Sequence, residues 1–478
     1  MGSVGESVLG SYSVPKETQK IFEKEILNNP LIPTLPWEIK AAGKHVSFTG
    51  NDLPSIPINW RFAESAAALK ALEASMLNVL RIRKYKCPVS EVEINTDHAS
   101  LFPMTPFLTK VLKDGQPQEI NVFRPGDMEK VGFPNTDLHR AGATPQRALA
   151  TNIYKTRDGR FYHIHGSMNS EPTLTALGMD LDGRPTEDRD AVTQRFQDVV
   201  GKLDSQELDS LMNDQYRQAG TICYSTEEFK KSEHGKANAH VGLYEIKKSE
   251  AHQQPAAWWP ENAGLHSSPK RPLAGLKVVD LTRVIASPAI GRSLAELGAS
   301  VMRVTSDQVT DMSILHQDLN WGKWNCTLHL KDEPDRLKLL ELIKEADVVI
   351  EGYRPGVMEK YGLGREDIFN LVKDRDRGII HVKENCYGWH GPWAGRSGWQ
   401  QISDANCGVS LAYGRAMGLD EAVTPVFPNS DYCTGIIGSV ATLHALINRA
   451  DEGGSYGVDV SASAIAIRAR LTDVLGLP

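Results

Sequence analysis

Strands and helices alternate over residues 275–384, and this alternation is the feature that most restricts the fold. Segments typical of buried strands are separated by segments with helical periodicity, and the connections are short. The expected strands are 275–281, 299–304, 347–353 and 377–384, and the expected helices are 291–298, 335–346 and 365–374. Repeats of this kind predict an α/β fold in which helices wrap a parallel sheet.

Composition divides the chain of 478 residues into five segments. The C-terminal half is predicted to form a Rossmann-like parallel-sheet large domain, and the N-terminal half to contribute a smaller α+β domain. A helix is expected over 60–83, a strand over 90–96, and a β-hairpin over 154–166 that turns at Asp158–Gly159. The predicted segments are an N-terminal arm (1–55), a helix and strand that pack with the large domain (56–104), the small domain (105–249), a proline-rich linker (250–271) and the large domain (272–478).

Charge and hydropathy exclude several classes of partner. A net charge of -7 and a pI of about 6.1 argue against binding to nucleic acid or to anionic membranes. The N-terminus lacks the pattern of a secretory signal, and no run of 18 apolar residues occurs. The sequence therefore predicts a cytoplasmic protein that acts on small molecules.

The cysteines and histidines predict neither a disulfide framework nor a metal site. The six cysteines are scattered and form no CxxC pair, which favours a reducing compartment (Cys87, Cys223, Cys326, Cys386, Cys407 and Cys433). His163 and His165 lie two apart on an expected strand and face the same side. Two ligands do not make a metal site, so we interpret them as a packed or exposed pair.

An internal echo links the two halves. Residues 77–95 align without a gap with residues 443–461. Leu77 then matches Leu443, and Arg83 matches Arg449. Both segments have the pattern of a helix, a turn and a strand.

Several segments resemble one family. "RPLAGLKVVDLTRVIASPAIGRSLAELGASVMRV", "ADVVIEGYRPGVMEKYGLGREDI" and "DYCTGIIGSVATLHALINR…GVDVS" are similar, in this order, to the CaiB/BaiF family, the class III CoA-transferases. They cover about residues 272–465. "ATNIYKTRDGRFYHIHG" and "YSTEEFKKSEHGK" resemble pieces of the family's small domain, which normally follows the large one. The resemblance implies that this chain is a divergent member of the family whose parts are arranged as a tandem repeat or a permutation. It also implies either a fused architecture or a homodimer.

The resemblance also implies a coenzyme A site at the strand ends. Convergent cations, backbone N–H groups and an apolar wall suit the phosphates and adenine of CoA. Where the family often has an acidic and then a basic residue after its second strand, this chain has Thr305 and Ser306. The implied contacts are Arg283, Ala286, Leu328, Lys331, Tyr353, Arg354 and Lys360.

Asp431 is the candidate catalytic residue. Taken alone, Asp431 in "DYCTG" has the residue types of a helix cap. In transferase members of the family, the aspartate of such a motif attacks the acyl-CoA thioester, which is covalent carboxylate catalysis. Thr434 or Gly435 lies nearer the expected cap, which leaves Asp431 to face a cleft. The echo places Ser65 at the matching position, so we expect one catalytic aspartate per chain.

Three further functions stay open. Racemase members of the family use a His as a second acid–base group. In this chain Trp399 and Gln400 occupy the positions of that His and of the Asp that follows it, and neither can exchange a proton near neutral pH. Asp404 and His390 are weaker candidates to replace the His. Ile285 replaces a Gln that oxalate-type transferases place near the reacting carbonyl, which makes the pocket more apolar. The sequence thus favours CoA transfer from a thioester to a carboxylic acid, with CoA as co-substrate and no permanently bound cofactor. Isomerisation of an acyl-CoA, a non-catalytic binding role, and chemistry on a free acid without CoA remain the alternatives.

Overall fold

A seven-stranded sheet organises the protein. The computed structural model describes residues 12–32, 35–121, 124, 126–184, 187–261, 264 and 268–468. The strand order is β11–β10–β9–β12–β13–β14–β8, and all pairs are parallel except β14–β8. The strands are β8 (Glu245–Lys248), β9 (Lys277–Leu281), β10 (Ser300–Thr305), β11 (Lys323–Thr327), β12 (Val348–Glu351), β13 (Ile380–Asn385) and β14 (Tyr456–Ser461). The predicted α/β fold with a parallel sheet is confirmed.

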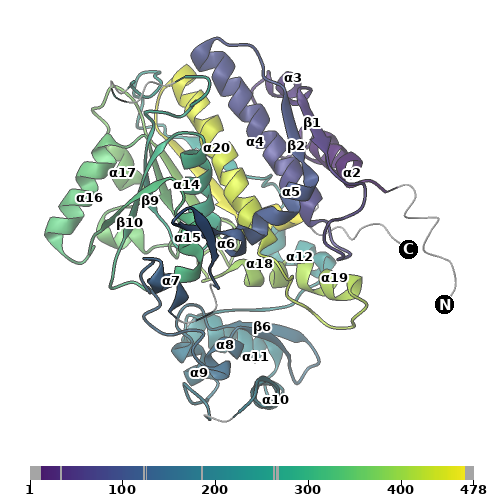
Figure 1. Cartoon of the computed structure of the whole chain (residues 1–478). Helices are drawn as coiled ribbons and strands as arrows, with labels where there is room; N and C mark the ends of the chain where they lie inside the picture. The colour runs from purple at the N-terminus through teal and green to yellow at the C-terminus, as the bar shows by residue number, and fades with distance from the viewer. Residues whose placement is uncertain are drawn as a thin grey trace.

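Helices cover both faces of this sheet because its strands are apolar on both sides. Successive strand residues point to opposite faces. Val278 and Ile350 face a core shared with α14 (Ala286–Glu296) and α20 (Asn429–Glu452), whereas Val279 and Val349 face a core shared with α16 (Glu333–Glu345) and α17 (Arg365–Leu371). Figure 1 shows α16 and α17 on one side of the strands and α20 on the other.

The internal echo is a structural repeat. Helix α4 (Phe62–Tyr85) precedes β2 (Val92–Asn95) as α20 precedes β14, and each helix has 24 residues. Strand β2 pairs in parallel with β1 (Val46–Thr49), as β14 does with β13. The two helices lie side by side and share one apolar core (Figure 1). At their N-terminal ends, the Asn429 amide donates to the Ser65 hydroxyl at 3.0 Å.

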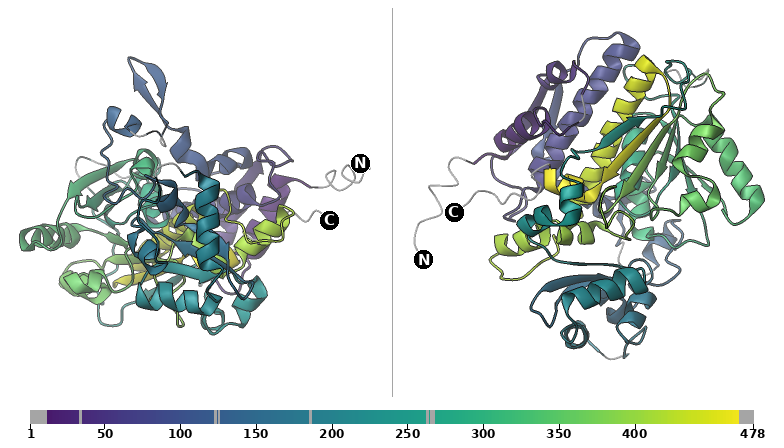
Figure 2. Two further views of the ribbon diagram at one scale, coloured as in Figure 1. Left: turned by 90° about the horizontal axis from the view of Figure 1, so that it is seen from below. Right: turned by 180° about the vertical axis from the view of Figure 1, so that it is seen from behind.

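A small lobe carries the rest of the N-terminal half. The predicted hairpin is confirmed as β5 (Asn152–Lys155) paired with β6 (Phe161–His165), and β7 (Ala219–Ile222) joins β6. Figure 1 places the lobe below the large sheet, and in Figure 2 (left) a two-stranded hairpin projects from the body. The lobe helices are α8 (Pro145–Leu149), α9 (Glu171–Ala176), α10 (Arg189–Val200), α11 (Ser205–Ser210) and η3 (Leu211–Gln215), and the projecting hairpin is β3 (Lys110–Lys113) with β4 (Gln116–Glu119).

Two expectations about segment roles differ from the structure. Residues 245–248 were expected in the small domain, but they form β8 at the edge of the large sheet because their backbone pairs with β14. The predicted linker is also packed: the Trp259 side chain is buried, and its indole N–H donates to the Ala274 carbonyl at 3.0 Å. Both segments therefore fasten the lobe's chain to the large sheet.

The remaining elements are short. Around α4 lie α2 (Val14–Lys20), η1 (Ile21–Ile26), α3 (Ile39–Gly43) and α5 (Thr96–Leu101), and the chain after α5 forms η2 (Phe102–Met104), α6 (Thr105–Leu108) and α7 (Asp127–Lys130). The other connections hold α12 (Thr226–Lys231), α13 (Glu233–Ala237), η4 (Ser313–Leu315), α15 (His316–Leu319), η5 (Met358–Tyr361), α18 (Gln400–Asn406), α19 (Val409–Ala416) and α21 (Ala462–Arg468). Of the helices in the described part of the chain, none is both long and apolar enough to cross a membrane.

A glycine lets α14 and α20 approach each other, and this contact can be tested. A Cβ atom on Gly435 would lie 2.4 Å from the Ala289 Cβ and 3.2 Å from the Ala286 carbonyl oxygen. We expect Gly435→Ala to lower the free energy of unfolding by about 1–3 kcal/mol through overpacking. Urea unfolding followed by circular dichroism measures this change.

Two further variants make that test specific. Ala289→Gly in the Gly435→Ala background should recover part of the lost stability, because it removes the atom that clashes. Gly142→Ala is the matched control, since its added Cβ meets open space. Equal stability of Gly435→Ala and the parent protein would contradict the close contact.

Candidate active site

A cavity of about 250 Å³ opens where the order of the sheet reverses. Strand β9 has β10 on one side and β12 on the other, so the loops after β9 and β12 diverge from this point. Ligands of such sheets bind at this switch point, beyond the carboxyl ends of the strands. The lobe closes the opposite wall with residues such as Ser167, Met168 and Gln218.

The loop after β9 is shaped by one unusual residue. Val284 has a φ of +72°, which is rare for a β-branched side chain and marks a backbone position fixed by its surroundings. Arg283 before it lies over the Tyr353 ring, with 5.1 Å from the guanidinium carbon to the ring centroid. Ile285 and Ala286 after it begin α14 and line the cavity.

Asp431 lies in the first turn of α20 and lines the cavity. The helix begins at Asn429, so the expectation of a cap near Thr434 or Gly435 was wrong. Thr434 donates its hydroxyl back to the Ser430 carbonyl within the helix, at 2.6 Å, instead of capping it. The positive end of the helix dipole stabilises negative charge in this first turn. Asp431 is half-buried and faces the cavity, as the sequence predicted.

Two other carboxyl groups lie near Asp431. Glu384, near the end of β13, lines the same cavity and accepts a hydrogen bond from the Ser287 hydroxyl at 2.8 Å. Burial raises the pKa of Glu384 to about 7. Asp404, on α18, accepts a hydrogen bond from Ser430 at 2.8 Å, and burial raises its pKa to about 7 as well.

The neighbouring acids also affect Asp431. Burial first, and then the negative charges of Glu384 and Asp404, raise the pKa of Asp431 well above its ordinary value. Groups that interact this closely lose their protons as a set. The acids of the cavity therefore keep their protons to a higher pH than free carboxyl groups do.

The histidine pair supports one wall of the cavity. His163 and His165 are both buried, and the His165 ring stacks on Trp399 with centroids 5.4 Å apart and planes 8° apart. The Trp399 indole N–H donates to the Ser167 hydroxyl at 3.0 Å. Burial lowers the pKa of His163 to about 4 and of His165 to about 3, so both stay neutral. They form the packed pair that was one of the two options from the sequence.

Two more cavities adjoin the first, and the three together are lined by six of the seven predicted CoA contacts. One of about 580 Å³ and one of about 150 Å³ are both lined by Thr305 and Ser306, and Tyr353 lines all three cavities. Arg283, Ala286, Tyr353 and Arg354 line the cavity of Asp431, whereas Leu328 and Lys331 line the smallest one. Lys360 is exposed on η5 and lines none of the three.

Three guanidinium groups gather beside this row of cavities. Arg354 donates to the Arg217 carbonyl at 3.3 Å, and its pKa is lowered by burial and then by the charges of Arg283 and Arg217. Among the described residues, no carboxylate lies within ion-pairing distance of Arg283 or Arg354. Uncompensated guanidiniums of this kind bind phosphate or carboxylate well.

The sequence did not indicate that Glu384 and Arg217 belong to the site. Glu384 is the last residue of the expected strand 377–384, and a charged residue at the end of a strand is normally exposed to solvent. It lines the cavity only because β13 is buried in the sheet. Arg217 comes from the lobe, and nothing in the local sequence indicates that it meets Arg354.

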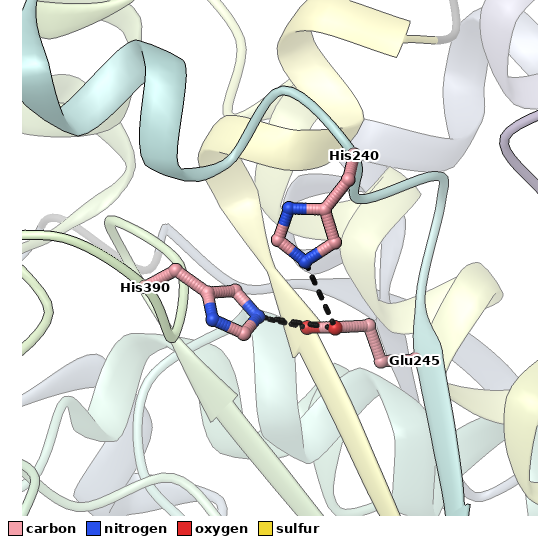
Figure 3. A group of neighbouring side chains, drawn as sticks. All are labelled: His240, Glu245 and His390. Atoms are coloured by element: carbon pink, nitrogen blue, oxygen red, sulfur yellow. Dashed lines mark hydrogen bonds and ion pairs between the residues drawn. The ribbon is translucent and has the colours of Figure 1, made fainter.

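His390, one of the two substitutes proposed for the missing racemase histidine, lies outside the cavity. It contacts Glu245 and His240 instead (Figure 3). Asp404, the other substitute, does not line the cavity, but it accepts a hydrogen bond from Gln400, which does. Neither residue therefore faces a substrate bound beside Asp431.

The raised pKa of Glu384 predicts a dependence of stability on pH. The folded pKa of about 7 exceeds the ordinary value of 4.5, so the folded protein holds this proton where the unfolded chain has lost it. The contribution is fully present below pH 4.5 and is lost as pH rises through 7. We expect Glu384→Gln, which cannot ionise, to be more stable than the parent at pH 8 by about 1–2 kcal/mol and equally stable at pH 4.5.

Unfolding free energies at the two pH values check this. Glu341→Gln, an exposed change on α16, is the control and should shift stability equally at both. A Glu384→Gln variant less stable than the parent at pH 8 would contradict burial of this carboxyl.

The chain is similar in sequence to known CoA-transferases. The sequence profile of CoA-transferase family III matches residues 273–474. Acetyl-coenzyme A transferase nodX of Hypoxylon pulicicidum is 60% identical over 450 residues, which cover 94% of this chain and 75% of that protein. An acyl-CoA transferase of Gibberella moniliformis is 36% identical over 427 residues, which cover 88% and 72%. A CaiB/BaiF family protein from Brucella suis, of known crystal structure, is 28% identical over 41% of this chain and 54% of that chain, with a TM-score of 0.36. This chain belongs to CoA-transferase family III, the CaiB/BaiF family.

Proposed function

We propose that this protein transfers CoA from an acyl-CoA thioester to a carboxylic acid through a covalent intermediate on Asp431. The observation that carries the proposal is the position of Asp431, which lines the same cavity as four of the residues expected to contact CoA (Arg283, Ala286, Tyr353 and Arg354). The relatives named as CoA transferases support the same reaction.

The reaction proceeds by four attacks, and the CoA thiolate released in the first and third is the nucleophile of the second and fourth. The Asp431 carboxylate attacks the thioester carbon and releases the CoA thiolate, which forms a mixed anhydride. The thiolate attacks the Asp431 carbonyl, releases the donor acid and leaves an aspartyl-CoA thioester. The acceptor carboxylate repeats the first attack on that thioester, and the thiolate then takes the acceptor acyl group. Asp431 returns to its starting state.

Glu384 supplies the polar group that Ile285 cannot. Its carboxyl lines the same cavity, and burial raises its pKa to about 7, so it keeps its proton to a higher pH than a free carboxyl does. A protonated Glu384 donates a hydrogen bond to the oxygen that becomes negative when Asp431 attacks. One such donor typically contributes a factor of about 10²–10³ to turnover.

The cations suit the other end of the substrate. The pantetheine arm passes Tyr353, which lines all three cavities, and the phosphates lie near Arg283, Arg354 and Lys331. Hydroxyl groups of Thr305 and Ser306 replace charged contacts at the second strand end, and they can still hydrogen-bond to phosphate or ribose.

A second candidate function has one observation in its favour. Isomerisation of an acyl-CoA needs two acid–base groups at the α-carbon, and Glu384 with Asp431 forms such a pair in one cavity. The trapping experiment below separates it from transfer.

The proposal also includes a homodimer and a cytoplasmic location. The family resemblance supports the dimer, and the six cysteines, all unpaired, are typical of a reducing compartment.

Covalent trapping tests the role of Asp431. Incubation of the protein with acetyl-CoA, followed by borohydride or hydroxylamine, should modify Asp431, and peptide mass spectrometry locates the change. Asp431→Asn should give no adduct and lose transfer by at least about 10³-fold. Glu384→Gln should still form the adduct, more slowly.

Other outcomes separate the alternatives. Exchange of deuterium into the α-carbon without an adduct would replace transfer by isomerisation. A protein that binds acyl-CoA but shows neither adduct nor exchange would refute both catalytic functions.

Calorimetric titration with CoA tests the cation contacts. Arg283→Gln and Lys331→Gln should each weaken binding by about 10- to 150-fold, because each removes a charged hydrogen bond worth about 1.5–3 kcal/mol. Lys360→Gln is the matched control and should change binding less than twofold, since Lys360 lines none of the cavities. An effect at Lys360 as large as at Arg283 would contradict the assignment.

A further inference from the structure

Three potential metal ligands converge on the surface, remote in sequence from Asp431. His240 follows α13, Glu245 is the first residue of β8, and His390 lies in the loop after β13. Figure 3 shows both imidazoles pointing their Nε2 atoms at the one carboxylate. The His390 Nε2 lies 3.0 Å from each Glu245 oxygen, and the His240 Nε2 lies 3.8 Å from Oε1.

These separations match those between ligands of one ion. One ligand atom from each residue can be chosen so that all three lie within 4.8 Å of one another. Ligands about 2.0–2.1 Å from a tetrahedral ion are about 3.4 Å apart, between the two measured distances. We propose that His240, Glu245 and His390 form a binding site for one divalent transition-metal ion such as zinc.

The ligand types select the class of ion. Two neutral imidazoles and a carboxylate suit zinc, cobalt, nickel or copper, whereas calcium and magnesium prefer sites built from oxygen alone. With these three ligands, the fourth coordination position of a tetrahedral ion is left for water. The side chains of His240, Glu245 and His390 are 61%, 31% and 38% exposed, so an ion reaches them directly from solvent.

The backbone around the three ligands is fixed. The Asn238 amide donates to the His390 carbonyl at 2.8 Å and so ties the loop of His240 to the loop of His390. Gly388, with a φ of +99°, packs so closely that an added Cβ would lie 2.6 Å from the Asn238 side chain. The Asn385 side chain accepts from the Gly388 N–H at 2.8 Å. The ligands therefore need little reorganisation to bind an ion.

The local charge also favours a cation. Glu245 lies opposite Asp459 in the β8–β14 register, so two carboxylates share one face of the sheet. Arg365 pairs with Asp459 at 2.6 Å, which leaves Glu245 to the two imidazoles. A metal ion held by the two imidazoles would balance this remaining charge.

The bound ion would tie two parts of the chain together. It would join the segment that returns from the lobe to the loop after β13, whose neighbours Asn385 and Cys386 line the active-site cavity. The role is structural, and the sequence did not predict it because His390 lies 145 positions beyond Glu245.

Titration of the metal-free full-length protein with cobalt(II), followed by visible absorption, tests the site. We expect one ion per chain with a spectrum of nitrogen and oxygen ligands, without the charge-transfer band that thiolates give. His240→Ala and His390→Asn should each weaken binding at least about tenfold, because even outer-shell changes cost 10–100-fold. His98→Ala, an exposed histidine on α5, is the matched control and should leave binding unchanged.

Thermal melts give a second readout. Zinc should raise the melting temperature of the parent and of His98→Ala by a few degrees, and it should not raise that of His240→Ala or Glu245→Gln. Melts without metal establish that each variant folds. Absence of saturable cobalt binding, or binding equal in the parent and in both histidine variants, would overturn the proposal and leave the cluster as a hydrogen-bonded pair.

Discussion

The close contact between α14 and α20 positions the active site. Gly435 and Gly438 on α20 have no side chains, so Ala289 and Ile290 of α14 pack directly against the α20 backbone. Helix α14 follows the loop that carries Arg283 and Ile285, and α20 carries Asp431 in its first turn. One helix–helix distance therefore sets the separation of Asp431 from the wall of the cavity. Larger residues at these glycines would move both together.

Charge is distributed unevenly along the proposed substrate path. The acids Asp431 and Glu384 line one cavity, and burial raises the pKa of both. Arg283 and Arg354 line the same cavity, Arg283 also lines the second cavity, and Lys331 lines the third. These two acids are therefore confined to the first cavity, whereas cations line all three. The cations suit the phosphates of a CoA thioester.

Sequence alone predicted the elements whose signals are local. The strand–helix alternation predicted the parallel sheet, and the turn at Asp158–Gly159 predicted the β5–β6 hairpin, because apolar periodicity and turn residues act within a few positions. The start of α20 was misplaced, because Gly435 looked like a cap residue whereas its size serves the contact with α14.

Functional residues brought together by tertiary structure were beyond such reasoning. Glu384 lines the cavity only because β13 is buried, and Arg217 meets Arg354 only because the lobe packs there. The edge strand β8 shows the same limit, since its four residues pair with β14 across more than two hundred positions. Asp431 could be identified because its motif is local and the family resemblance assigned it a role.

The repeat of α4 and α20 has a consequence for how the chain folds on the ribosome. The apolar face of α4, which includes Leu69, Leu72 and Met76, is buried against a helix that begins only at Asn429. At about 5–20 residues per second, synthesis leaves that face without its partner for about 20–70 s. The N-terminal segments α2, η1 and α3 pack on α4 and shield part of it during this interval. This early helix is thus among the last to complete its core, which makes the nascent chain dependent on protection from aggregation.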